Sequence, residues 1–461
     1  MMKKLLALTL ALIVTAALFA GCGSEDSSSA AESKADASSA DESVGESTAD
    51  SAADSAPEST AAPESTADST SDFLDSRAEW EKQMVAPADA PFTPDHDNIT
   101  ENMLRRSLHS TGNAEYRLLA KLKEAQSPDA KKLTQIAFLG DSITAGSGAT
   151  NSKYQYVKQF ENWFKENVSV LCKVTNAGIG ATDSYLGVHR VDKDVLSLEP
   201  DIIFIEFIND RDDEFYQTTM DSLIRKCLAA PGDPAVVLVE MSLKGGGNCQ
   251  TAHSAAAATY GVPVLSYHDA ITPEIDAGNF SFDDLSADGT HPNNVGHSWV
   301  AKIIENYCAT LLKADSTPHI EPFDTSVESP TGDKYAGSHI SDLSTGDVTV
   351  TDMGPWVEAS TPYNFQNGWS TGTAGTITFE MEFKNLGLVY YKDIKGNPGI
   401  ARIAVDGKDC MEVDSNFKGG WGSYAANVEV YASDEVKKHT VTVTVPEGEN
   451  TEFEVLAWLV S

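Results

Sequence analysis

The chain has 461 residues, of which 41% are hydrophobic and 22% are charged. Its 69 aspartate and glutamate residues outnumber its 33 lysine and arginine residues, and the formal net charge is −36. This acidic excess opposes binding to a phosphate backbone or an anionic lipid surface, so nucleic acid is not an expected partner. The length predicts two or three domains at about 100–200 residues each. Six cysteines without C-x-x-C spacing are too few for a disulfide framework.

The N-terminal residues resemble a bacterial lipoprotein signal. Two lysines precede a short apolar run over residues 5–20, which is typical of a secretory signal peptide and too short to span a bilayer comfortably. The run ends at Cys22 in a pattern similar to the lipobox, with Phe19 where leucine is usual. We therefore expect a signal peptide over 1–22 and lipidation of Cys22. The alternative is an ordinary cleaved signal followed by a chance cysteine.

Residues 23–72 consist almost entirely of Ser, Ala, Thr, Asp, Glu and Pro. Such a segment buries too little apolar surface to offset a backbone ordering cost of about 1–2 kcal/mol per residue, so we expect it to be disordered. Its like charges favour an extended linker. With a lipid at Cys22, the linker would hold the folded domains at the bacterial cell surface, outside the cytoplasm, with the anchor as the only membrane contact.

Residues 73–316 alternate short apolar runs with amphipathic stretches. This pattern predicts strands separated by helices in a parallel sheet, and thus a three-layer α/β/α domain. Aromatic and aliphatic residues recur at helical spacing over 156–164 and 299–311, which indicates core-facing helices. The predicted strands are Gln135–Leu139, Val168–Val174, Ile202–Phe207, Ala235–Glu240 and Val262–Ser266.

Residues 348–461 have a different pattern, with short alternating runs separated by Gly and Pro. Period-two alternation at this spacing predicts an antiparallel β-sandwich, with 317–347 as the linker before it. The sandwich loosely resembles the jelly-roll modules attached to carbohydrate esterases. The predicted runs are Thr376–Phe383, Ala401–Val405, Val428–Tyr431, Thr440–Val445 and Phe453–Val460.

A serine follows the first predicted strand in the sequence Gly140-Asp141-Ser142. The carboxyl ends of strands are where α/β sheets keep their sites, and a following helix offers backbone N–H groups to an anion. Ser142 is therefore a candidate nucleophile. Serine is also a common helix N-cap, and this motif alone leaves that alternative open.

Three further segments follow later strands and supply what acyl transfer requires. Gly180 and Ala181 lie in a small-residue stretch whose N–H groups can approach a ligand. Asn209 offers an amide donor to an oxyanion. Asp288 stands three residues before His291, so that one turn can bring the carboxylate to the imidazole.

Together these four segments resemble the blocks of the SGNH, or GDSL, hydrolase superfamily over about Asn98–Leu312, including a helix-like lead-in at Asn102–Ala125. The resemblance implies a flavodoxin-like fold and an acyl-enzyme mechanism that needs no metal or other cofactor. It implies Ser142 as nucleophile, His291 as general base and then acid, and Asp288 as its orienting carboxylate. The implied oxyanion hole combines the Ser142 N–H, a second-block N–H from Gly180 or Ala181, and the Asn209 side chain.

Two departures from the family pattern preserve these donors. Ala181 stands where the second block has glycine, and Phe207 stands where the third block often has glycine. His297, Asp283 and Asp284 lie near the predicted pair but lack a tight metal-ligand spacing, so we predict no metal site there.

In the second domain, Trp421 and Tyr424 lie in a glycine-rich loop and are the candidate glycan contacts. Aromatic residues also fill sandwich cores, which is the alternative interpretation. We therefore expect a secreted, membrane-tethered serine esterase that removes acyl groups, chiefly acetyl, from a polysaccharide such as xylan. The alternatives are a lipase, thioesterase or arylesterase acting on small acyl esters, and a glycan-binding surface protein without catalytic activity.

Overall fold

The structure is a computed structural model that describes residues 84–360 and 364–461. The predicted signal peptide, the lipidation site Cys22 and the acidic linker 23–72 lie outside the described residues. Among the helices that the structure does describe, none is both long enough and apolar enough to cross a membrane.

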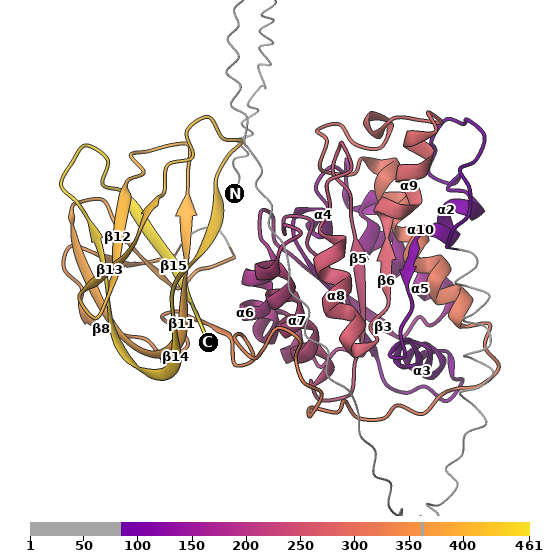
Figure 1. Cartoon of the computed structure of the whole chain (residues 1–461), viewed down its shortest axis with the longest axis horizontal. Coiled ribbons are helices and arrows are strands. Elements are labelled where there is room, and N and C mark those ends of the chain that lie inside the picture. Colours follow the sequence, from indigo (N-terminus) through magenta and orange to yellow (C-terminus); the bar gives the residue numbers. More distant parts are fainter. Residues whose placement is uncertain (1–83, 361–363) are drawn as a thin grey trace, which may run out of the picture. The chain divides into compact units, whose positions relative to one another are not determined.

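The first folded domain is built on a six-stranded sheet with the order β1-β6-β5-β4-β2-β3 (Figure 1). Neighbouring strands run parallel except for β1, which pairs with β6 in the antiparallel sense. The carboxyl ends of the parallel strands therefore meet at one edge of the sheet. The strands are β1 (Leu108–Ser110), β2 (Thr134–Gly140), β3 (Cys172–Gly178), β4 (Ile202–Glu206), β5 (Ala235–Glu240) and β6 (Val264–Ser266).

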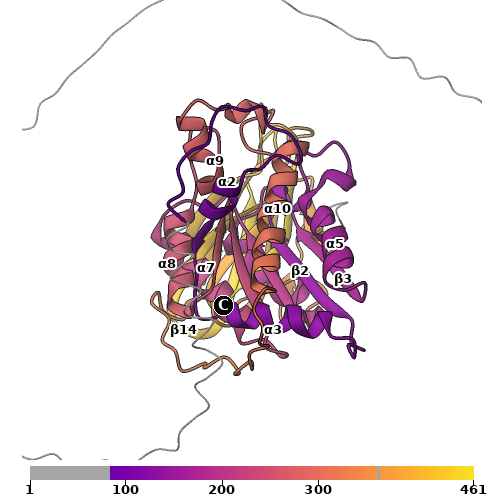
Figure 2. The ribbon, with the colours of Figure 1, turned by 90° about the vertical axis from the view of Figure 1, so that its right-hand side faces the viewer.

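Successive strand residues point to opposite sides of this sheet, and helices cover both faces. In β2, Phe138 belongs to one buried cluster and Leu139 to the other. The first cluster is closed by α2 (Glu101–Arg106), α3 (Glu115–Gln126), α5 (Tyr156–Asn167), α9 (Tyr267–Asp276) and α10 (Asn294–Leu311). Figure 2 looks onto the face that α10 and α5 cover. The second cluster is closed by α6 (Ser184–Asp194), α7 (Glu214–Leu228) and α8 (Gln250–Tyr260). This confirms the predicted three-layer α/β/α class.

Two local predictions for this domain were wrong. The strand predicted over Val168–Val174 begins only at Cys172, because Val170 and Leu171 are 75% and 44% exposed and do not enter the sheet. The helix-like lead-in Asn102–Ala125 is two helices, α2 and α3, separated by the edge strand β1. Short 3₁₀ turns also occur at Ser152–Tyr154, Leu196–Leu198 and Phe282–Asp284.

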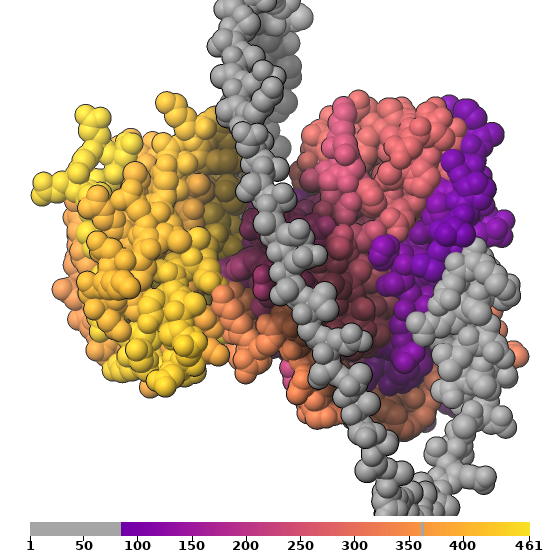
Figure 3. All heavy atoms as spheres, in the orientation of Figure 1, coloured from indigo at the N-terminus to yellow at the C-terminus, as the bar shows by residue number. Residues whose placement is uncertain are grey.

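The first described residues form an arm that lies along α9 and α10, seen as indigo spheres at the margin of the domain (Figure 3). The backbone N–H of Asp89 donates to both carboxylate oxygens of Glu274, at 3.2 and 3.0 Å. The indole of Trp299 donates to the carbonyl of Asp95 at 2.8 Å. These contacts make the arm part of the first folded domain.

The second folded domain is a nine-stranded antiparallel sheet around its own core, as predicted. The runs predicted at Val428–Tyr431 and Thr440–Val445 belong to one long strand, and β7 falls inside the segment 317–347 that was predicted as linker. The strands are β7 (His339–Ser341), β8 (Thr349–Asp352), β9 (Val357–Ala359), β10 (Gly368–Thr371), β11 (Gly375–Lys392), β12 (Ile400–Val405), β13 (Lys408–Asp414), β14 (Tyr424–Val445) and β15 (Phe453–Val460).

The buried cluster over α6 and α7 continues into the second domain, where it includes Val389, Leu456 and Leu459. Polar contacts accompany it: the Asn427 amide donates to a carboxylate oxygen of Asp183 at 3.1 Å. All five cysteines of the described residues are free thiols, and Cys172, Cys227, Cys249 and Cys308 are buried. Apolar packing, without disulfides among the described residues, joins these elements.

Candidate active site

The turn after β2 presents Ser142 as the first residue of the short helix α4 (Ser142–Ala145). Asp141, and not Ser142, is the N-cap, and its carboxylate accepts the Ile143 N–H at 2.9 Å. Gly140 is required in this turn, because a Cβ there would lie 2.1 Å from Thr144 Oγ1 and 2.6 Å from the Glu206 carbonyl oxygen. The Ser142 hydroxyl is thus not consumed by helix capping.

Ser142, His291 and Asp288 form a continuous line of hydrogen bonds. The Ser142 Oγ lies 2.8 Å from His291 Nε2, and His291 Nδ1 lies 2.7 Å from Asp288 Oδ2. The other carboxylate oxygen of Asp288 accepts the backbone N–H groups of Thr290 and His291 at 2.9 and 2.8 Å. With Nδ1 donating to Asp288, Nε2 is left as the acceptor for the serine proton.

Asp288 is held in its ionised form. Partial burial raises its pKa, but the hydrogen bonds from the His291 ring and from the backbone N–H groups of His291 and Thr290 outweigh burial and lower the pKa to about 2. The carboxylate is lost only as the pH falls through that value. Asp288 therefore keeps an acceptor facing His291 at any pH near neutrality.

The segments predicted to form an oxyanion hole lie beside this line. A Cβ added at Gly180 would have Ser142 Cβ as its nearest neighbour, at 3.7 Å. Ala181 has φ 58°, a left-handed conformation that favours glycine and that alanine adopts here with some strain. The Asn209 backbone N–H donates to Asp141 Oδ2 at 3.2 Å, and one amide proton of its side chain goes to the Thr182 carbonyl at 2.9 Å. Its second amide proton is left for a ligand.

Several buried polar residues of this region were not singled out by the sequence. Arg190 of α6 is fully buried and donates to the carbonyl oxygens of Gly140 and Ala177 at 2.8 and 2.7 Å, so it ties the ends of β2 and β3 together. Burial, with the neighbouring Glu206 carboxylate, raises the pKa of Asp141 well above its ordinary value. Burial raises the pKa of Glu206 to about 7.

The residues set aside as metal ligands have other partners. His297 Nε2 lies 2.9 Å from the Ser147 carbonyl, and burial lowers the pKa of His297 to about 4, so the ring is neutral and joins α10 to the loop after α4. Asp283 pairs with Lys244 at 2.6 Å. The Asp284 carboxylate accepts the Ser281 backbone N–H at 2.8 Å.

The candidate glycan contacts are a group of aromatic rings on the second domain. Trp421 is 69% exposed, and its ring lies 5.7 Å from that of Phe417 and 5.5 Å from that of Tyr424. By contrast, Trp356 and Trp369 are buried in the core. Among the tryptophans that the structure describes in the second domain, Trp421 is therefore the one exposed to solvent.

A cleft of about 320 Å³ lies at the carboxyl end of β3. Its lining combines Asn176, Gly178 and Ile179 of the first domain with Ile340 and Phe365 of the second. Residues of both domains thus border a cavity one to two residues from Gly180 in the chain.

Comparisons with known proteins agree with this geometry. Residues 138–299 match the model of the GDSL-like lipase/acylhydrolase family. A crystal structure of a two-domain esterase active on acetylated mannans is similar to this chain, with 29% identity, a TM-score of 0.69, and coverage of 78% of this chain and 98% of that chain. A structure described in the same words and co-crystallized with mannopentaose gives 28% identity, a TM-score of 0.68, and coverage of 78% and 97%. No match to this chain was found among curated proteins.

The first folded domain is a GDSL-like acylhydrolase domain. The protein is a carboxylic ester hydrolase that carries this domain together with an antiparallel β-domain.

Asp288→Asn tests the line of hydrogen bonds. In this variant the asparagine oxygen still accepts the Thr290 and His291 N–H groups, so its NH₂ group faces His291 Nδ1. Nδ1 then acts as an acceptor and Nε2 carries the ring proton. This tautomer cannot accept the proton of Ser142. We expect kcat to fall by about 10⁴-fold with little change in fold, measured by steady-state hydrolysis of p-nitrophenyl acetate and by circular dichroism. A variant that keeps a tenth or more of the wild-type kcat would contradict the assigned role of Asp288.

Proposed function

We propose that this protein is a serine esterase that removes acetyl groups from a polysaccharide through an acyl-enzyme. The observation that carries the proposal is the line from Ser142 Oγ through the His291 ring to Asp288, with distances of 2.8 and 2.7 Å. Gly180 approaches Ser142, and Asn209 shares the Asp141 carboxylate with the turn that presents Ser142.

In the proposed reaction, His291 takes the Ser142 proton as the hydroxyl oxygen attacks the ester carbonyl. The oxyanion accepts the Ser142 N–H, an N–H from Gly180 or Ala181, and the free amide proton of Asn209. His291 then passes its proton to the departing sugar oxygen. In the second half of the reaction, His291 takes a proton from a water molecule that attacks the acyl-enzyme, and returns it to the Ser142 oxygen as acetate leaves. One oxyanion donor is typically worth about 10²–10³ in rate, or roughly 2.7–4 kcal/mol.

The polysaccharide substrate is supported by the two-domain likeness. The similar esterase, which acts on acetylated mannans, matches this chain over 98% of its own length and therefore through both of its domains. Acetylated mannan is therefore the first substrate to test, with acetylated xylan beside it.

The test uses protein without residues 1–72 and measures acetate released from acetylated mannan, from acetylated xylan and from p-nitrophenyl esters of increasing chain length. We expect acetate from polysaccharide, a preference for short acyl chains, and loss of activity in Ser142→Ala to the background rate. Asn209→Ala should lose about 10²–10³ in kcat. A preference for long chains would indicate a lipase, and full activity of Ser142→Ala would overturn the mechanism.

We also propose that the chain is exported and anchored by a lipid on Cys22, as the sequence pattern predicts. Full-length protein produced in a bacterial host should enter the membrane fraction and incorporate a labelled fatty acid. Cys22→Ser should do neither while remaining catalytically active. Equal membrane association of the two proteins would contradict the anchor.

For the second domain we propose glycan contact through Trp421 and Tyr424, because exposed aromatic rings stack on sugar rings. In an inactive Ser142→Ala background, Trp421→Ala should weaken binding to insoluble mannan in a pull-down assay. Val436→Ala is the matched control, since Val436 is also exposed, at 66%, but lies in the long β14 strand and away from this loop. Unchanged binding of the Trp421 variant would contradict the proposal.

A further inference from the structure

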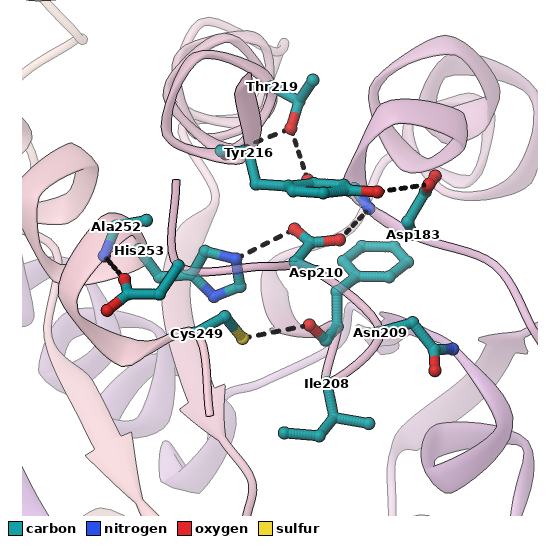
Figure 4. A network of polar contacts seen from close by, with 12 residues as sticks. Asp183, Ile208, Asn209, Asp210, Tyr216, Thr219, Cys249, Ala252 and His253 are labelled. Carbon is teal, nitrogen blue, oxygen red and sulfur yellow. Dashed lines mark hydrogen bonds and ion pairs between the residues drawn. The ribbon is translucent and has the colours of Figure 1, made fainter. Parts of the chain in front are cut away.

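Behind Asn209 lies a buried polar cluster that the proposed reaction does not use. His253, in α8, is 1% exposed, and each of its ring nitrogens faces a carboxylate. Nε2 lies 2.9 Å from Asp210 Oδ2, and Nδ1 lies 2.9 Å from Glu240 Oε1 at the end of β5. Figure 4 shows His253 pointing at Asp210, the residue that directly follows Asn209.

Two ionised carboxylates around one ring favour a proton on each ring nitrogen. A neutral imidazole would turn a lone pair toward one of the carboxylates, whereas the imidazolium donates to both. Burial lowers the pKa of His253, but Cys249, Glu240 and Asp210 together raise it well above its ordinary value. His253 is therefore a buried cation between two acceptors.

The same cluster contains residue types that can bind a metal ion. The potential ligand atoms of Glu240, Cys249 and His253 lie within 4.8 Å of one another. The same three residues also make hydrogen bonds that need no ion. The Cys249 thiol lies 3.3 Å from the carbonyl oxygen of Phe207, to which it donates. Hydrogen bonding accounts for these contacts without an ion.

These contacts hold the chain on both sides of Asn209. Before it, Phe207 is tied to Cys249. After it, Asp210 is tied through one carboxylate oxygen to His253 and through the other to the Ser184 N–H of α6, at 2.8 Å. Asn209 itself is exposed at the site, while Phe207 and Asp210 are buried. The backbone that carries Asn209 is thus also held from the side of α8, while the amide itself donates to the Thr182 carbonyl.

We propose that His253 is a positioning residue for the oxyanion hole, because its ring clamps Asp210 and so fixes the adjoining Asn209. This inference rests on the proposed function of Asn209. Without the ring, Asp210 and Glu240 lose the cation between them, and the Asp210 side chain is held only from Ser184. Because the oxyanion forms only in the transition state, the loss falls on kcat and leaves KM nearly unchanged.

The test is a double-mutant cycle in the full chain, with kcat and KM measured on acetylated mannan and on p-nitrophenyl acetate. We expect His253→Gln to lower kcat by about 10²-fold, which is the typical cost of a misplaced catalytic group. Asn209→Ala should lower kcat by about 10²–10³-fold. The double variant should then be no slower than Asn209→Ala within about threefold, because both changes remove the same donor.

His189→Gln is the matched control. His189 is also a buried histidine, 2% exposed, but its Nδ1 contacts the Tyr185 carbonyl within α6. We expect this variant to keep the wild-type kcat, even where its melting temperature falls. A kcat loss in His189→Gln as large as that in His253→Gln would show a general effect of removing buried histidines and would overturn the proposal.

Three other outcomes are decisive. Losses that multiply in the double variant, to about 10⁴-fold or more, would show that His253 acts independently of Asn209. One equivalent of zinc in purified protein, absent from His253→Gln, would replace the proposal with a metal site. Wild-type kcat in Asn209→Ala would refute the proposed function of Asn209 and leave the His253 contacts unexplained. If His253→Gln does not fold, Glu240→Gln enters the same cycle and must show the same non-additivity.

Discussion

The carboxylate of Asp141 joins the two chain segments on which the site depends. It accepts the Ile143 N–H in the turn that presents Ser142 and the Asn209 N–H in the loop after β4. The two segments are far apart in sequence, and they meet because β2 and β4 are neighbours with parallel register, so that Gly140 lies opposite Glu206. The glycine at 140 is the steric condition for this approach, since any Cβ would collide with Thr144 and Glu206. The proposed nucleophile and the proposed oxyanion donor are thus positioned by one buried group.

Much of this arrangement could be predicted from local patterns. The apolar runs at 202–206 and 235–240 are buried on both faces, and such strands stand out in a sequence. Val170 and Leu171 misled the prediction because an apolar pair at the surface looks the same in sequence as one at the start of a strand. The three-residue strand β1 is too short to show a period. The contact between Asp210 and His253 joins residues 43 positions apart, and each residue alone is compatible with solvent exposure.

The segment predicted as linker shows a different kind of limit. Residues 317–347 are rich in Pro, Gly and Ser, which indicates a loop. Yet Tyr335 is 1% exposed, its hydroxyl donates to Glu429 of β14, and Ser338 donates to the Val188 carbonyl of α6 at 2.9 Å. These groups are ordered by surfaces that exist only once both domains have folded. The composition of a segment indicates how much apolar surface it can bury by itself. Tyr335 and Ser338, by contrast, are buried against residues of the two folded domains.

Four buried carboxylates surround a place where negative charge would develop. Burial raises the pKa of Asp141 and Asp210, that of Asp183 to about 6, and that of Glu206 to about 7. If all four were ionised without compensation, their field would oppose an oxyanion beside Ser142. Two buried cations offset them: Arg190 lies under the ends of β2 and β3, and His253 lies against Asp210. The carboxylates can then orient backbone N–H groups at close range while the two cations compensate part of their charge. The raised pKa values of the carboxylates reduce the remaining negative charge further.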